Sequence, residues 1–262
     1  MCLIFLALKN HSKYKLVVAA NRDEFYDRKT APASFWEDHP EILGGRDLEA
    51  MGTWLGVTTS GRICMVTNFR DLRNIKANAP SRGKLVTDFL LGKSSGEEYL
   101  KKIESRALQY NGFSLIAGTV DSLYYFSNYR DGVILLNSGL FGLSNHLLET
   151  PWPKVEKGKM DIQLLLKKSD FRTEDFLPVL SDETIHGDEH LPDTGVGLSL
   201  ERALSAAFIK SPDYGTRSST VIMVDYNNHV HFHERVYDPA TSGFSHHTFQ
   251  YSIGQRESPE KK

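Results

Sequence analysis

The chain lacks the features of several protein classes. Only two of its 262 residues are cysteine, which excludes a disulfide framework and a zinc site built from cysteines. Its 31 basic and 33 acidic side chains leave a formal net charge of −2, which argues against a polybasic nucleic-acid scaffold and a charged disordered chain. No stretch approaches the roughly 18 apolar residues of a membrane span. The remaining composition, 40% hydrophobic and 24% charged, is that of an ordinary globular protein.

The apolar start of the chain does not have the features of a secretion signal. The run 2–8 is short, has no basic leader and ends at Lys9 without a small-residue cleavage site. No lipoprotein-type stretch precedes Cys2. We therefore expect a cytoplasmic protein without an integral membrane segment, in which both thiols stay reduced.

Short apolar runs separated by polar turns predict a series of β-hairpins. The predicted strand pairs are 2–8 with 14–20, 52–58 with 62–68, 113–118 with 123–127, 133–137 with 139–145, and 218–225 with 230–236. The polar and aromatic segment 21–45, which contains Pro32 and Pro40, is predicted to be irregular.

Helical patterns occur in pairs and do not alternate with the strands. They cover residues 83–91, 96–107, 152–168 and 198–208, and the polar stretch 169–197 is predicted to be rich in loops. This order favours an α+β protein in which two antiparallel sheets lie between helical layers, a four-layer αββα sandwich. We expect a single domain over residues 1–253 and a charged, flexible tail over residues 254–262.

The two cysteines differ in position. If Met1 is removed, Cys2 carries a free α-amino group with a pKa of about 7.7–8.0, so one residue supplies both a nucleophile and a base. The alternative is that Cys2 is a small apolar residue in a buried strand. Cys64 lies between Ile63 and Met65 in a predicted strand and is interpreted as an inert core thiol.

Four strongly hydrogen-bonding residues, Asn21 to Glu24, follow the second predicted strand. If the first hairpin forms, they lie beside the start of the first strand. A carboxylate of this cluster could then orient the amine of Cys2, and its arginine, Arg22, could stabilise the thiolate. The alternative is a solvated turn with weak surface ion pairs.

Two asparagines and one arginine lie at the ends of other predicted strands. Asn68 and Asn145 each end a strand, where an amide could donate to a developing oxyanion or simply form a turn. Arg217 belongs to segment 215–220, which offers hydroxyls and backbone amides but lacks the Gly-Lys pattern of a phosphate-binding loop.

Alternating histidines mark the last predicted hairpin. His229, His231 and His233 would share one face of a strand, where they could ligate a metal or form a solvated face, and we favour the solvated face. His246 and His247 are predicted to lie in a loop.

Eight motifs, spread in order over nearly the whole chain, resemble those of the NRDE family, the family of transport and Golgi organisation protein 2. The motifs are Met1-Cys2-Leu3-Ile4-Phe5, Asn21-Arg22-Asp23-Glu24-Phe25, Gly44-Gly45-Arg46-Asp47, Gly52-Thr53-Trp54-Leu55-Gly56, Thr67-Asn68-Phe69-Arg70, Gly142-Leu143-Ser144-Asn145, Thr150-Pro151-Trp152-Pro153-Lys154 and Gly215-Thr216-Arg217-Ser218-Ser219-Thr220. The resemblance implies the αββα fold of N-terminal nucleophile (Ntn) hydrolases. It also links the chain to Golgi organisation, mitochondrial metabolism and haem or lipid handling, without an agreed biochemical activity.

A looser resemblance extends to cysteine Ntn hydrolases of the penicillin V acylase and bile-salt hydrolase type. It implies that Asp23 and, in a displaced position, Arg22 match the family's second-strand aspartate and arginine. Asn68 and Asn145 are similar to its two asparagines, and Arg217 is similar to its late arginine.

Together these residues predict an amide hydrolase that acts on a small non-peptide substrate through a Cys2 acyl-enzyme, without a metal or organic cofactor. The alternative is a non-catalytic protein on the same scaffold that binds or traffics haem or an acyl lipid, with haem as its cofactor. Expected partners are a small-molecule amide or a lipid-like ligand and no nucleic acid, and a homo-oligomer is compatible with the sequence.

Overall fold

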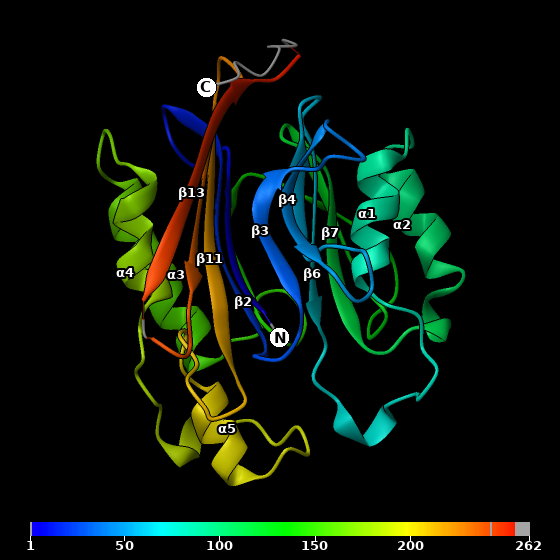
Figure 1. Cartoon of the computed structure of the whole chain (residues 1–262), viewed down its shortest axis with the longest axis vertical. Coiled ribbons are helices and arrows are strands. Elements are labelled where there is room, and N and C mark those ends of the chain that lie inside the picture. Colours follow the sequence, from blue (N-terminus) through cyan, green and yellow to red (C-terminus); the bar gives the residue numbers. More distant parts are fainter. Residues whose placement is uncertain (1, 242, 255–262) are drawn as a thin grey trace.

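Two antiparallel sheets lie face to face in the computed structural model, which describes residues 2–241 and 243–254 (Figure 1). Helices α1 (Gly83–Leu91) and α2 (Gly96–Glu104) cover the outer face of one sheet, and α3 (Pro153–Leu166) and α4 (Leu177–Leu180) cover the outer face of the other. A further helix, α5 (Leu198–Leu204), lies at one end of the sandwich. The predicted αββα class is therefore confirmed. The predicted tail 254–262 lies outside the described residues from 255 onward.

The first sheet joins the two ends of the chain. Its strand order is β10-β1-β2-β11-β12-β13, so that the first predicted hairpin pairs with the last one through β2 and β11. The bounds are β1 (Cys2–Leu8), β2 (Tyr14–Phe25), β10 (Gly139–Leu143), β11 (Tyr214–Asp225), β12 (His229–Tyr237) and β13 (Phe244–Ser252).

The second sheet follows chain order, β3-β4-β5-β6-β7-β8-β9, because each of its strands pairs with the next one. The bounds are β3 (Thr30–Phe35), β4 (Ile42–Asp47), β5 (Leu55–Thr58), β6 (Arg62–Asn68), β7 (Phe113–Thr119), β8 (Ser122–Ser127) and β9 (Ile134–Leu136). Short 3-10 turns occur at Leu72–Asn74, Ala107–Gln109, Thr173–Phe176 and Asp188–His190.

Strands replace two segments that the sequence predicted to be irregular. Segment 21–45 contributes the end of β2, all of β3 and the first four residues of β4, so the prediction was wrong. Pro32 fits because β3 is an edge strand whose pairing with β4 shifts register between Ala31 and Ser34, where a missing N–H removes no ladder bond. His246 and His247 lie in β13 and not in a loop, since this edge strand pairs along its length with β12.

The predicted hairpin 133–145 was also wrong, because its two strands belong to different sheets. β9 pairs with β8, whereas β10 pairs with β1. Leu136 and Leu143 are both buried in the core between the sheets, so this crossing keeps both apolar side chains away from water.

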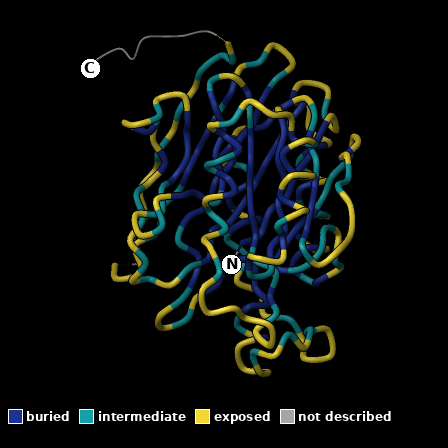
Figure 2. The backbone as a smooth tube through the Cα atoms, turned by 90° about the vertical axis from the view of Figure 1, so that its right-hand side faces the viewer, coloured by how far each residue is buried: buried dark blue, intermediate teal, exposed yellow. Residues whose placement is uncertain are grey.

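Buried side chains form three clusters, one between the sheets and one beneath each helical layer. Figure 2 shows the buried residues in the interior of the molecule and the exposed ones mainly at its edges. β1 contributes to two of the clusters: Ile4 and Leu6 face the second sheet, and Leu3 and Phe5 face α3 and α4. Burial on both faces explains why its sequence is a continuous apolar run. The approach of α3 to β1 requires Gly158, since a Cβ there would lie 2.1 Å from the Phe5 ring.

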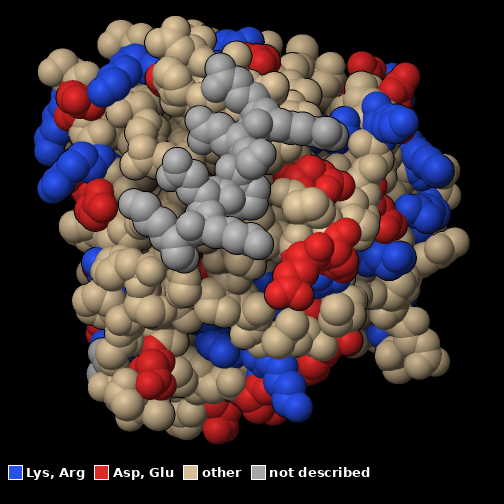
Figure 3. Space-filling view, turned by 45° about the horizontal axis from the view of Figure 1, so that its top comes forward, with Lys and Arg blue, Asp and Glu red and all other residues tan. Residues whose placement is uncertain are grey.

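Within the described residues, no helix is long and apolar enough to cross a membrane. The face shown in Figure 3 carries both basic and acidic side chains, in keeping with the near-zero net charge.

Candidate active site

Cys2 is the first residue of β1 and lines a cavity of about 770 Å³. Three other predicted site residues, Arg22, Asp23 and Asn68, line the same cavity. Arg22 and Asp23 come from the neighbouring strand β2, and Asn68 comes from the end of β6 in the second sheet. The cavity therefore lies at one end of the sandwich, where residues from both sheets meet.

Cys2 is only 8% exposed. Burial raises its pKa, and the negative charge of Asp23 acts in the same direction. The positive charge of Arg22 and a hydrogen bond from the Asp23 backbone amide lower the pKa, but they do not offset burial. The thiol is therefore protonated at neutral pH and needs a base before it can act as a nucleophile.

Asp23 lies next to the amino side of Cys2, because Cys2 pairs with Arg22 in the antiparallel register. Its carboxylate Oδ1 accepts a hydrogen bond of 2.7 Å from the Thr216 hydroxyl in β11. Burial raises the pKa of Asp23, whereas the positive charge of Lys154 on α3 lowers it. The carboxylate is thus held in a dry environment by groups from two other elements.

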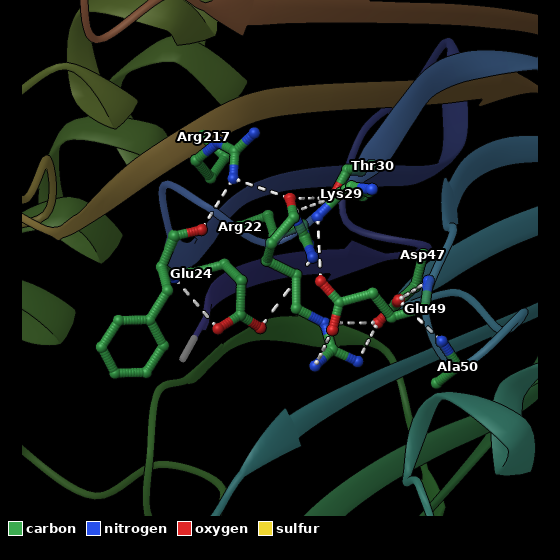
Figure 4. Close-up of polar contacts among 10 residues, drawn as sticks. Arg22, Glu24, Lys29, Thr30, Asp47, Glu49, Ala50 and Arg217 are labelled. Carbon is green, nitrogen blue, oxygen red and sulfur yellow. Dashed lines mark hydrogen bonds and ion pairs between the residues drawn. The ribbon is translucent and has the colours of Figure 1, made fainter.

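Arg22 faces the second sheet, on the side of β2 opposite to Asp23. Its guanidinium lies 4.2 Å from the centre of the Trp54 ring and donates a 3.0 Å hydrogen bond to the Thr30 hydroxyl. Its ion pair with Glu24 is longer, at 3.9 Å (Figure 4). These contacts fix the arginine beside the thiol with its charge only weakly compensated.

The two asparagines lie one behind the other. Asn68 lines the cavity, whereas Asn145 is absent from its lining and donates from Nδ2 to the Asn68 backbone carbonyl at 3.2 Å. The Asn145 carbonyl in turn accepts a hydrogen bond from the Arg70 backbone amide at 2.8 Å. Asn145 follows β10, so this pair also joins the two sheets.

Arg217 is placed away from the thiol. It sits in β11 at a register shift between Thr216 and Ser218, and it does not line the 770 Å³ cavity. Its guanidinium Nη1 donates to the backbone carbonyls of Phe25 at 2.7 Å and Arg28 at 3.1 Å (Figure 4). Arg217 thereby holds the turn that follows β2.

Two residues near the site were missed by the sequence analysis. Arg82 lines the cavity, donates to the Gly112 carbonyl at 2.9 Å and has its pKa lowered by burial. Lys154 is buried behind Asp23, and burial lowers its pKa to about 8. Lys154 ends the motif 150–154, and this membership could have marked it as a site residue. No spacing in the sequence indicates that Arg82 lies near Cys2.

A smaller, more apolar cavity of about 320 Å³ adjoins the first one. Both cavities are lined by Glu24, Phe25, Asn68, Arg82 and Asn111. The apolar walls of the second include exposed side chains from three separate segments, namely Phe25, Leu72, Ile75 and Leu200. Exposed apolar side chains that converge on one hollow mark a binding surface.

The histidines of β12 do not converge. His233 is buried between the Thr173 hydroxyl at 3.1 Å and His246 at 2.7 Å, whereas His229 is exposed and bonds to Asp225 at 2.9 Å. Over residues 2–241 and 243–254, no group of three or more histidine, cysteine, aspartate or glutamate side chains could hold a metal ion.

Comparison with solved structures identifies the class of fold. A Caenorhabditis elegans N-acylethanolamine-hydrolyzing acid amidase ortholog aligns with 84% of this chain and 92% of its own, with a TM-score of 0.50 and 12% identity. At this identity the likeness shows the fold alone, which is that of the Ntn hydrolases.

The family follows from the sequence comparisons. The chain belongs to the Transport and Golgi organisation 2 family, whose family model matches residues 1–239. The mouse Transport and Golgi organization 2 homolog is 35% identical over 275 residues, covering 97% of this chain and 99% of its own length. The Bos taurus homolog is 39% identical over 264 residues, with 90% and 92% coverage.

Proposed function

We propose that this chain is an N-terminal-cysteine amide hydrolase that cleaves the C–N bond of a small non-peptide substrate after Met1 is removed. The observation that carries the proposal is the placement of Cys2, Arg22, Asp23 and Asn68 around one cavity of about 770 Å³. This volume lies within the range of about 300–1,000 Å³ that is usual for small-molecule sites.

The first step is activation of the thiol. Removal of Met1 frees the α-amine of Cys2, whose ordinary pKa of about 7.7–8.0 allows it to accept the thiol proton near neutrality. Asp23, beside the amino side of Cys2, stabilises the ammonium that forms. Arg22 stabilises the thiolate by its charge.

Acylation follows. The Cys2 sulfur forms a bond to the amide carbonyl carbon, and the carbonyl electrons move onto oxygen, where the Asn68 amide donates a hydrogen bond. The tetrahedral intermediate then collapses and the C–N bond breaks. The α-ammonium delivers its proton to the leaving nitrogen, so that an amine departs and a thioester remains on Cys2.

Hydrolysis of the thioester completes the cycle. The α-amine takes a proton from water, the hydroxide adds to the thioester carbonyl, and the C–S bond breaks. The sulfur recovers the proton, and the carboxylic acid leaves. In this scheme Asn145 holds the Asn68 backbone and Arg217 holds the turn after β2, so both act as positioning residues.

The charges of the cavity favour a neutral or cationic leaving amine. Its lining has five carboxylates and three guanidinium groups. They belong to Asp23, Glu24, Asp27, Asp47 and Glu49, and to Arg22, Arg28 and Arg82. Arg28 is paired with Asp47 at 2.8 Å and Glu49 at 3.1 Å, which reduces its attraction for an anion.

The test compares the two cysteines. We expect intact mass to show loss of Met1, a panel of small N-acyl amides to be hydrolysed, and Cys2→Ala to abolish turnover. Cys64→Ala is the matched control, because Cys64 is fully buried outside this cavity and should leave turnover unchanged. Retention of Met1, or turnover by Cys2→Ala equal to the wild type, would refute the proposal.

A second candidate function is non-catalytic binding of an acyl lipid. The adjoining apolar cavity of about 320 Å³ favours it, because a ligand with a polar head beside Cys2 would have room for an apolar chain there. No histidine among the described residues lines either cavity, so the iron ligand in a haem complex would be Cys2 or Tyr214. Retained binding of a fatty acid by Cys2→Ala, with no acid released from amides by the wild type, would favour this candidate.

We further propose a reducing, cytoplasmic location for the hydrolase, because its mechanism requires a free thiol. Detection of the tagged full-length chain in a cytosolic fraction would support this location, and its enrichment in an organelle would contradict it.

A further inference from the structure

A third cavity, of about 530 Å³, lies on the outer face of the first sheet. It is enclosed by the segment after α4, the segment before β11 and the connection between β12 and β13. None of the residues that line it lines the cavity of Cys2. It is thus a separate cavity, which is linked to the Cys2 site through the Thr216 hydroxyl, since Thr216 lines this cavity and donates to Asp23.

Aromatic side chains form its walls. Phe208 and Tyr237 meet edge to face, with ring centres 4.7 Å apart at an interplanar angle of 83°. Phe244 forms a further wall. The Tyr237 hydroxyl is held by the Ser219 hydroxyl at 3.0 Å, so its ring is fixed. Edge-to-face walls of this kind accommodate another planar ring.

Arg235 supplies a positive charge that lacks an anionic partner. Within the part of the chain that the structure describes, its guanidinium makes no hydrogen bond or ion pair and lies 4.4 Å from the centre of the Phe244 ring. The other charged side chains of the lining are engaged. Lys210 is paired with Glu183 at 2.5 Å, and Asp238 accepts hydrogen bonds from Ala240 and Thr241.

The walls are held in place without a ligand. The Thr216 hydroxyl accepts from the Ile209 amide at 2.9 Å, and the Thr216 amide donates to the Ile209 carbonyl at 2.9 Å. The Phe208 amide donates to the Asp182 carbonyl at 2.8 Å. Gly215 allows Tyr26 to approach, since a Cβ there would lie 2.2 Å from the tyrosine hydroxyl. A preformed cavity binds a ligand without losing further conformational entropy in its walls.

We propose that this cavity binds a small aromatic carboxylate. The planar guanidinium of Arg235 matches a carboxylate with two parallel hydrogen bonds, and the ring of the ligand packs against Phe208 and Tyr237.

The test uses a matched pair of ligands, phenylacetate and its neutral analogue phenylacetamide, titrated into the full-length protein by calorimetry. We expect phenylacetate to bind at least tenfold more tightly than phenylacetamide. Equal affinity for the two, or no saturable binding of phenylacetate at millimolar concentration, would overturn the proposal. This comparison uses the wild type and does not depend on how any variant folds.

Variants locate the binding. Arg235→Gln should reduce the preference for phenylacetate to less than twofold, and Arg235→Lys should retain part of it, because lysine keeps the charge but loses the planar fork. The double variant Lys210→Gln/Glu183→Gln removes a paired charge of each sign and should keep the tenfold preference. A full preference in Arg235→Gln, with native circular dichroism, would refute the assignment.

Discussion

A buried ion pair fixes α5 against the second sheet, and its removal should measurably destabilise the protein. Arg70, just after β6, pairs with Glu201 of α5 at 3.0 Å, and their side chains are only 3% and 4% exposed. Glu201 also accepts hydrogen bonds from the amide and hydroxyl of Thr194, at 2.8 and 2.6 Å. Arg70 lies 4.7 Å from the centre of the Trp152 ring. The pair is therefore dry. Glu201 is hydrogen-bonded from several sides, whereas the buried Nε of Arg70 has no hydrogen-bond partner within the described residues.

Glu201→Gln keeps the shape of the side chain but leaves the Arg70 charge buried without its partner. Removal of one member of a buried pair costs about 3–5 kcal/mol. The double variant Arg70→Met/Glu201→Gln removes both charges, and it should be more stable than the sum of the two single losses predicts. We expect a coupling energy of at least about 2 kcal/mol in this cycle.

The assay is urea denaturation followed by far-UV circular dichroism. The matched control is Asp193→Asn, because Arg73 and Asp193 are also 3.0 Å apart but are 63% and 84% exposed. Exposed pairs contribute about 0–1 kcal/mol, so this variant should unfold near the wild type. A loss below about 1 kcal/mol in Glu201→Gln, with no coupling in the double variant, would refute the reasoning that burial makes this pair decisive.

Three further predictions concern single residues. Because burial lowers the pKa of Lys154 to about 8, the unfolded chain binds more protons than the folded one between that pH and the ordinary lysine pKa of about 10.4. The free energy of unfolding should therefore rise with pH across this window more steeply in the wild type than in Lys154→Met. Urea midpoints that change equally with pH in the two proteins from pH 7.5 to 10 would contradict this. Iodoacetamide should label Cys2 well before Cys64 in the native protein, as read by peptide mass spectrometry, because Cys2 lines a cavity and Cys64 is fully buried; equal rates would be incompatible with an accessible nucleophile. Gly158→Ala should lower the thermal midpoint by several degrees, because its Cβ would clash with the Phe5 ring, and an unchanged midpoint would mean that α3 moves freely.

The proximity of Cys2 to Asp23 could be predicted from the sequence, because both belong to one hairpin. A hairpin pairs residues that are close along the chain, so the apolar runs and the polar turn between them determine which residues meet. The start of β1 and the end of β2 therefore lie side by side, as the register of Cys2 with Arg22 shows. The αββα class was predictable for a similar reason, since paired helices among hairpins leave few ways of covering both sheets.

The rest depended on contacts between distant segments. The local pattern of apolar residues did not show that β9 and β10 belong to different sheets. Each strand has an apolar face that either sheet could bury. The same pattern did not distinguish Asn68, which lines the cavity, from Asn145, which donates a hydrogen bond to the Asn68 backbone carbonyl. Both asparagines end strands, and only the packing of one sheet on the other decides which amide faces the hollow.

The sequence by itself determined four of the five predicted hairpins, the approximate ranges of α1, α2, α3 and α5, and the position of a cysteine beside an aspartate. These depend on side-chain periodicity and on turns, which act over a few residues. Only the tertiary structure decided that Arg82 joins the cavity of Cys2, that Arg217 holds a turn outside it, and that Arg235 stands without an anion among aromatic rings. The physical reason is that burial and charge pairing depend on which distant segments pack against each other in the fold. The spacing of residues along the chain does not specify those long-range contacts.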